Sequence, residues 1–483
     1  MTTDGLDPLA QLLQRLQRTN DAFERHFRGA ATRVQPVHTL YWGAHLLRPD
    51  SWRRLGDAAR DAFATWAEDP PQLARALGFP GADSLPRDRQ GVDACSQRFA
   101  DDPDGFAAEL PEAALAWAVH TRVRERLARA PIEDLRIDFE DGYGIRSDAE
   151  EDADATACAR ALADAIADGS ASRCSGIRIK PLTNACARRS IATLDRFVGT
   201  LVERTGGIPS GFRVTLPKVQ HVDHVEVMVE LLSRCEQRLG LPTGALPFEF
   251  MVEVTQVVFD RYGRFQLPAC IRAGGDRLLA VALGVYDFTA SCGITAAWQS
   301  IDHPMCDVAR GFMTLACAGT PVEICDGSTN VLPVEPHPRG GDERTRANRE
   351  AVWRAWRLMH DHVRRSLVGG YVQGWDLHPA QVPVRWAANY RFFLEALPAA
   401  STRLRSYLER ATAATDGAAV LDDAATGQAL LGFLLRARDS AAIDTDALRR
   451  AGLADDELAL RSFPELLARR RRARDAGGAG SPA

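Results

Sequence analysis

The chain has 483 residues, a formal net charge of −5 and 46% hydrophobic residues. This length suits one barrel of about 250 residues with large additions, or two to three domains. The charge shows no basic excess for nucleic acid, and the ten cysteines form no C-x-x-C pair or zinc pattern. No signal peptide and no apolar run of membrane-spanning length is visible, so we expect a cytoplasmic protein with reduced thiols.

The N-terminal third carries helical patterns around one strand. Apolar residues recur at helical spacing from Pro8 to Arg28 and predict a helical arm over residues 1–35. The stretch "PVHTLYWGAHLL", from Pro36, predicts a first strand. Residues 69–130 begin with a Pro-rich connection and continue with a helical stretch. Because this segment is longer than a crossover between two strands needs, we interpret it as a helical insertion.

Beyond this insertion, short apolar stretches alternate with helical segments. Apolar runs of this kind are typical of strands buried on both faces, and the alternation predicts a parallel sheet. Eight strands favour a closed (β/α)8 TIM barrel, over residues 36–383. An open doubly wound sheet would need a Gly-rich phosphate turn, and "GYGIRS" lacks its third glycine. The predicted strands begin at Pro36, Asp134, Gly176, Phe212, Pro247, Leu278, Gly319 and Tyr371.

The last hundred residues are rich in helical patterns. Residues 384–467 carry aromatic and aliphatic side chains at helical spacing and predict a helical packing module, at a subunit interface in one interpretation. Residues 468–483 begin with an arginine run and end in "GGAGSPA", which predicts a disordered basic tail.

Charged residues gather at the ends of the predicted strands, where the chemistry of such barrels takes place. Carboxylates at the ends of neighbouring strands five and six can share one hard cation such as Mg²⁺. A nearby arginine can grip a substrate carboxylate with two hydrogen bonds. Metal and arginine together meet the needs of an enolate derived from a 2-keto acid or a thioester. From strand two to strand eight, these charged residues are Asp138, Glu140, Asp141, Arg178, Lys180, Lys218, Glu253, Asp287, Asp326, Asp376 and His378.

Seven short motifs, in order, resemble the citrate lyase β-subunit/HpcH-HpaI aldolase superfamily, with a broader likeness to malate synthase. They are "HTLYWGAHL", "IDFED", "IRIKP", "LPKV", "FMVEV", "LGVYDF" and "GWDLHPAQV", and they extend from about Pro36 to Tyr390. The resemblance implies a magnesium-dependent barrel of the phosphoenolpyruvate/pyruvate type. The chain departs from that family in its length, in Val254 after the glutamate and in Lys180. It therefore resembles an uncharacterised bacterial subgroup.

The resemblance also implies roles for single residues. Arg178 would bind the substrate carboxylate and Glu253 and Asp287 would bind Mg²⁺, or Mn²⁺ in its place. Glu140 and Asp141 would be carboxylates that support these ligands or face the substrate. Coenzyme A thioesters are an option, although no motif locates a site for the coenzyme. The partners expected are a small carboxylate substrate and further copies of the chain, in a trimer or a multiple of it, but neither nucleic acid nor a membrane.

The remaining candidates are less specific. Lys218, Gly284 and Asp326 lie at strand ends where they could contact substrate. His303 follows strand six and could act as general acid or base, or it could be a loop histidine bonded to backbone. We predict a magnesium-dependent carbon–carbon lyase or aldolase-type enzyme for a small 2-keto acid, 2-hydroxy dicarboxylate or acyl thioester. The alternatives are phosphoryl transfer on an enol phosphate such as phosphoenolpyruvate, and a barrel that binds a metabolite without turnover.

Overall fold

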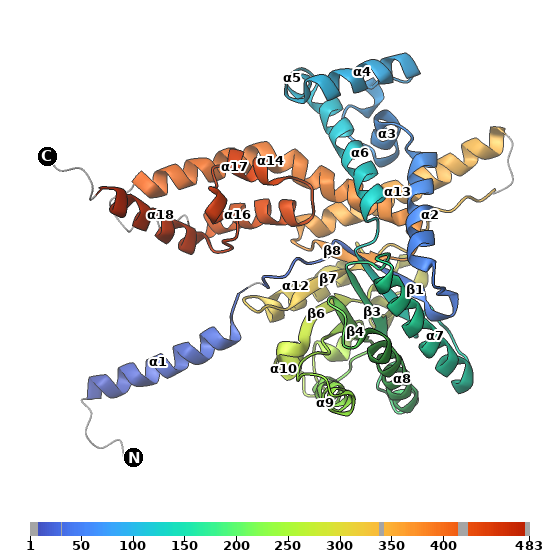
Figure 1. Ribbon diagram of the computed structural model, residues 1–483, viewed down its shortest axis with the longest axis vertical. Coiled ribbons are helices and arrows are strands. Elements are labelled where there is room, and N and C mark those ends of the chain that lie inside the picture. The colour runs from blue at the N-terminus through green and yellow to red at the C-terminus, as the bar shows by residue number, and fades with distance from the viewer. Residues whose placement is uncertain (1–7, 30, 338–341, 414–423, 479–483) are drawn as a thin grey trace.

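Eight parallel strands close a barrel in chain order in the computed structural model, which describes residues 8–29, 31–337, 342–413 and 424–478. The first strand pairs with both the second and the eighth, so the described sheet has no free edge. The predicted (β/α)8 fold is therefore confirmed (Figure 1). The strands are β1 (His38–Gly43), β2 (Asp134–Asp138), β3 (Cys174–Arg178), β4 (Phe212–Leu216), β5 (Phe248–Val252), β6 (Leu278–Leu283), β7 (Glu323–Ser328) and β8 (Gln373–Asp376).

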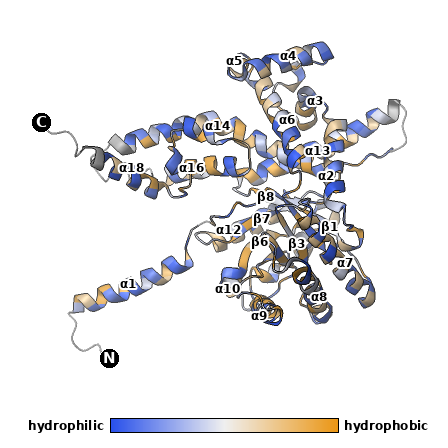
Figure 2. Cartoon of the chain, in the orientation of Figure 1, coloured by the Kyte–Doolittle hydropathy of each residue, from blue (hydrophilic) through white to orange (hydrophobic). Residues whose placement is uncertain are grey.

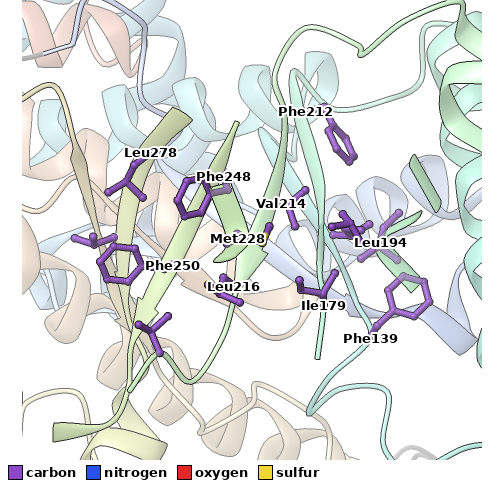
Figure 3. Close-up of a cluster of buried hydrophobic side chains, with 14 of the residues drawn as sticks. Phe139, Ile179, Leu194, Phe212, Val214, Leu216, Met228, Phe248, Phe250 and Leu278 are labelled. Carbon is purple, nitrogen blue, oxygen red and sulfur yellow. The ribbon is translucent and has the colours of Figure 1, made fainter. Parts of the chain in front are cut away.

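Helices surround the barrel and cover the outward side chains of its strands. Successive strand residues point to opposite faces, so every second residue faces the helices. Figure 3 shows strand residues such as Val214 and Phe250 in one buried cluster with Leu194 and Met228 from two of these helices. The surrounding helices include α2 (Ser51–Trp66), α7 (Asp148–Ala167), α8 (Ala187–Thr205), α9 (Val222–Leu239), α10 (Leu267–Gly274), α12 (Pro304–Cys317) and α13 (Asp342–Val368).

The inward side chains form layers of different chemistry. At the N-terminal ends of the strands, the buried Arg136 guanidinium lies 2.8 Å from Asp134, 3.0 Å from Glu249 and 2.6 Å from the Thr215 hydroxyl. Above this charged layer lies an apolar one. Because the apolar layer closes the middle of the barrel, the charges at the C-terminal mouth form a separate group. The apolar layer consists of Tyr41, Met251, Ala282, Cys325 and Trp375.

The helical insertion and the C-terminal helices share a second hydrophobic core. Trp117 of the insertion, Trp356 of α13 and Trp386 and Leu434 of the C-terminal part belong to one buried cluster. These two additions to the barrel therefore pack as one body, beside it in Figure 1. Their helices are α3 (Pro70–Leu77), α4 (Arg89–Asp101), α5 (Pro103–Glu109), α6 (Pro111–Arg129), α14 (Val382–Ala413), α16 (Ala424–Asp439), α17 (Thr445–Arg450) and α18 (Phe463–Gly478).

The prediction of a disordered tail from residue 468 is wrong as far as Gly478. This segment continues α18 as a helix, and residues 479–483 lie outside the described residues. The arginine run is ordered because it meets acids of the preceding turn. Arg470 lies 2.5 Å from Glu457, which is itself buried, and Arg469 pairs with Asp456.

The N-terminal arm is the helix α1 (Pro8–His26), which projects away from the barrel in Figure 1. None of the residues Pro8–His26 is buried. Figure 2 shows hydrophobic and hydrophilic residues mixed along the helix. Across the described ranges of the chain, no helix combines the length and the apolar character that crossing a membrane requires.

Candidate active site

Asp138, the last residue of β2, organises one side of the barrel mouth. Its Oδ1 accepts a hydrogen bond from the backbone N–H of Glu140 at 2.9 Å, and its Oδ2 accepts one from Gly142 at 2.7 Å. The same two oxygens accept hydrogen bonds from Nε and Nη2 of Arg178, the last residue of β3, at 2.7 and 2.6 Å. A bidentate pair of this kind fixes the plane of the guanidinium.

Arg178 is only 4% exposed and lies on the apolar layer of the barrel. Its guanidinium carbon is 5.0 Å from the centre of the Tyr41 ring and 5.9 Å from that of Trp375. Its remaining terminal nitrogen, Nη1, lies 3.1 Å from Oε2 of Glu140. Carboxylates of the protein therefore already occupy the edges of Arg178 on which a substrate carboxylate could be held.

Lys218 occupies the centre of the mouth, two residues beyond β4. Its φ of 51° is in the left-handed region, which non-glycine residues seldom adopt. Its ammonium contacts Glu140, lies 3.3 Å from an oxygen of Asp141 and 3.1 Å from Oδ2 of Asp287. Its backbone N–H donates to Oε1 of Glu253 at 2.5 Å. One lysine thus joins carboxylates that follow β2, β5 and β6.

Glu253 is the most enclosed of these carboxylates, with 1% of the residue exposed. Burial raises the pKa of Glu253 to about 8, against the opposing effect of Lys218 and Arg178. A glycine at 284 is required by its position: a Cβ added there would lie 2.4 Å from Cβ of Glu253. Gly284 thus packs closely against Glu253, and its predicted contact with substrate stays a prediction.

The mouth carries more negative than positive groups. Within the described chain, five carboxylates (Asp138, Glu140, Asp141, Glu253 and Asp287) lie around two basic residues, Arg178 and Lys218, whereas Lys180 pairs with Glu151 outside this group. An excess of carboxylates around a buried acid fits a hard cation. Among the described residues no three His, Cys, Asp or Glu side chains are arranged to hold a metal ion. The predicted pair Glu253 and Asp287 would thus leave several positions of such an ion to water or substrate, as is usual for Mg²⁺.

A cavity of about 980 Å³ lies on the protein surface at the loops beyond two of these strands. It is lined by the loops that follow β4 and β5, and these loops begin within two residues of Lys218 and Glu253. Gln266 ties the two loops together, since its side-chain nitrogen donates to the carbonyl oxygens of Gln220 and Gln256. The side chains of the charged cluster do not line this cavity.

The model of the family described as "Domain of unknown function (DUF6986)" matches residues 16–466. The chain belongs to this family. Its fold is also similar to a citrate lyase from Burkholderia xenovorans LB400, with 19% identity, a TM-score of 0.48, and 69% of this chain and 92% of that one covered. For the magnesium/glyoxylate complex of malate synthase from Haloferax volcanii, the identity is 12%, the TM-score 0.41 and the coverage 87% and 99%. Likenesses this weak transfer no activity to the DUF6986 chain.

Two predicted site residues of this DUF6986 member lie apart from the charged cluster. His303 is the N-cap of α12, where its Nδ1 accepts a hydrogen bond from the backbone N–H of Met305 at 3.1 Å. Asp326 faces the surrounding helices: it lies 2.9 Å from Arg310 of α12 and 2.5 Å from the Ser366 hydroxyl of α13. Among the described residues, no hydrogen bond or ion pair joins either one to Lys218, Glu253 or Asp287.

The roles of three residues of the DUF6986 site were not predicted from the sequence, although Asp138 was named there as a strand-end acid. Asp138 anchors Arg178, and Tyr41 and Trp375, whose rings stack with their centres 4.5 Å apart, form the floor beneath it. Strand alternation could have identified the role of Asp138, because it lies two residues before Glu140 and so on the same face. The aromatic pair comes from the first and last strands, and only closure of the barrel shows that they meet.

Proposed function

We propose that this protein is a magnesium-dependent carbon–carbon lyase or aldolase-type enzyme. Its substrate would be a small 2-keto acid, a 2-hydroxy dicarboxylate or an acyl thioester that reacts through an enolate. The observation that carries this proposal is the meeting of Glu253 and Asp287, from neighbouring strands, at one residue: Asp287 contacts the Lys218 ammonium and Glu253 accepts from the Lys218 backbone N–H. Two carboxylates at the mouth of a barrel provide the kind of ligands that Mg²⁺ uses.

In the proposed reaction each residue of the mouth has a distinct task. Glu253 and Asp287 would hold the ion, which supplies Lewis acidity to a substrate carbonyl. Arg178, fixed by Asp138 and buried on the aromatic floor, keeps a positive charge beside the oxygen on which negative charge develops. Glu140 and Asp141, which lie in the cluster, would move the proton, and His303, which caps α12, would not.

The test is a cleavage and condensation screen of the purified protein with 2-keto acids, 2-hydroxy dicarboxylates and acyl-CoA esters. Each substrate is measured with Mg²⁺ and with a chelator, and product formation is followed by mass spectrometry. The proposal predicts turnover that disappears with the chelator and falls by at least about a hundredfold in Glu253→Gln, because oxyanion stabilisation contributes at least that much.

Glu230→Gln is the matched control, because Glu230 lies on the exposed face of α9 and pairs only with Arg234. Glu230→Gln should keep the wild-type rate if the loss of activity in Glu253→Gln is caused by the change at the barrel mouth. Turnover that survives both the chelator and Glu253→Gln would contradict the proposal. A further reaction with ATP and pyruvate tests the alternative of phosphoryl transfer, which would give a phosphorylated product.

A further inference from the structure

We propose that Lys218 is a built-in cation that occupies the carboxylate cluster in the metal-free protein and has to leave it when a divalent ion binds. This inference rests on the proposed function, because it concerns the same carboxylates. It adds a competitor to the site: the Lys218 ammonium and an ion held by Glu253 and Asp287 would both need the space beside the Asp287 carboxylate. Ion binding would therefore release an ammonium group into the barrel mouth.

The side chain and the backbone of Lys218 contact different carboxylates. The ammonium alone reaches Glu140, Asp141 and Asp287, whereas Glu253 is held by the backbone N–H. Because the left-handed backbone at this position fixes the N–H, Glu253 keeps its place when the side chain moves. Lys218 can thus leave the cluster without disturbing the most buried of its carboxylates.

The composition of the chain makes this lysine stand out. Of the 59 basic residues, two are lysines, Lys180 and Lys218, and the rest are arginines. Both lysines follow neighbouring strands at the barrel mouth. Lysine carries a compact charge on a flexible stem with three rotatable donors, whereas the planar fork of arginine suits one carboxylate held in two bonds. Only the compact group can mimic a small ion among acids that approach from several directions.

Lys180 shows what a purely structural lysine is like in the same mouth. Its ammonium is 2.6 Å from Glu151 of α7, which is almost fully buried, and 2.8 Å from the carbonyl oxygen of Phe139. It therefore ties β3 to a surrounding helix. It contacts none of Glu140, Asp141 and Asp287 among the described residues. The two lysines form an internal comparison, with one inside the carboxylate cluster and one outside it.

The first experiment labels the wild-type protein with limiting acetic anhydride and quantifies acetylation of Lys180 and Lys218 by peptide mass spectrometry. Ammonium groups held by carboxylates react slowly, because the acylating agent attacks the neutral amine. With Mg²⁺, Lys218 labelling is expected to rise several-fold while Lys180 labelling stays constant. Sodium chloride at equal ionic strength is the control. Unchanged or reduced labelling of Lys218 with Mg²⁺ would overturn the inference.

The second experiment measures Mg²⁺ and Mn²⁺ affinity by calorimetry in Lys218→Met. Methionine keeps the length of the side chain and the backbone N–H, but removes the charge. The variant is expected to bind the ions at least about tenfold more tightly, since a unit charge in contact with the ligands opposes a second cation strongly. Lys218→Arg retains the charge and should bind no more tightly than the wild type.

Arg264→Met is the matched control, because it removes an exposed charge beside the neighbouring cavity, away from the cluster. If the wild type and Lys218→Met both bind no ion, the proposed function falls together with the inference. If the wild type binds the ion and Lys218→Met binds it equally or less tightly, the function stands and only the inference falls. Should Lys218→Met not fold, the labelling of the wild type decides alone.

Discussion

At the scale of single residues, the contact between Gly284 and Glu253 makes the mouth intolerant of even one added carbon. A Cβ at 284 would lie 2.4 Å from Cβ and 2.6 Å from Oε2 of Glu253. Both values are far below ordinary van der Waals contact. A side chain at this position would have to displace the buried carboxylate, and with it the acceptor of the Lys218 N–H.

Gly284→Ala is therefore expected to weaken Mg²⁺ binding by about 10–100-fold, the usual effect of disturbing a group that positions a metal ligand. It should also lower the free energy of unfolding by about 1–3 kcal/mol, as overpacking does. Calorimetric titration and urea unfolding measure the two effects. Gly311→Ala in α12, where nothing lies within 4 Å of the added carbon, is the control. Equal affinities in both variants would disprove the role of Gly284.

Much of the candidate site follows from the sequence because acids at strand ends are read directly from the order of residues. Glu140, Asp141, Arg178, Glu253 and Asp287 can all be identified in this way. The central place of Lys218 was not, because it depends on a left-handed backbone that no neighbouring residue signals. The pairing of Arg178 with Asp138 was also not predicted, because it depends on which two strands lie side by side.

At the scale of elements, the buried histidine of α6 links the helical insertion to the barrel. His120 is 5% exposed, and its Nε2 lies 3.0 Å from the carbonyl oxygen of Ala67, which follows α2. Burial lowers the pKa of His120 to about 4. In acid the unfolded chain therefore takes up a proton at this residue before the folded protein does.

The contribution of His120 to stability is complete above about pH 6.5 and is lost as the pH falls towards about 4, by up to about 1.4 kcal/mol per pH unit. His120→Gln should lack this part of the acid sensitivity. Urea unfolding of both proteins between pH 7 and pH 4 measures the difference. His26→Gln, in the exposed α1, should behave as the wild type does. Parallel curves for wild type and His120→Gln would refute the prediction.

The N-terminal helix is an element that the rest of the described chain does not need for stability. Residues Pro8–His26 include none that is buried, whereas Arg28 pairs with Asp276 and Arg33 donates to the carbonyl oxygen of Leu279. Deletion of residues 1–26 should change the free energy of unfolding by no more than about 0.5 kcal/mol, the range of surface changes. Deletion of residues 1–36 removes the Arg33 and Gln35 contacts and should destabilise measurably. Thermal unfolding of the two proteins provides the comparison.

At the scale of the whole molecule, the barrel was predictable and the packing of its additions was not. Strand–helix alternation repeated eight times leaves few ways to arrange a parallel sheet. The insertion and the C-terminal helices share one core. It contains residues that are far apart in sequence, such as Trp117 and Trp386. Local patterns indicate that each helix has an apolar face, but they do not indicate which distant helix packs against that face. The ordered arginine run of α18 was missed for the same reason, because Arg470 meets Glu457.

The helix α14 connects the barrel with the outer helices. Its first turns are fastened to the barrel, since Arg385 pairs with Asp376 at 2.7 Å and the Trp386 indole donates to the carbonyl oxygen of Pro131. Its middle turns pack against α16, where Phe392 and Phe393 lie against Phe433, and the helix also contacts α18. Pro398 lies beyond these turns and interrupts the hydrogen bonding along the helix. A change of the helix direction at Pro398 would therefore move the last turns of α14 and leave the turns beside β8, and the aromatic floor under Arg178, in place.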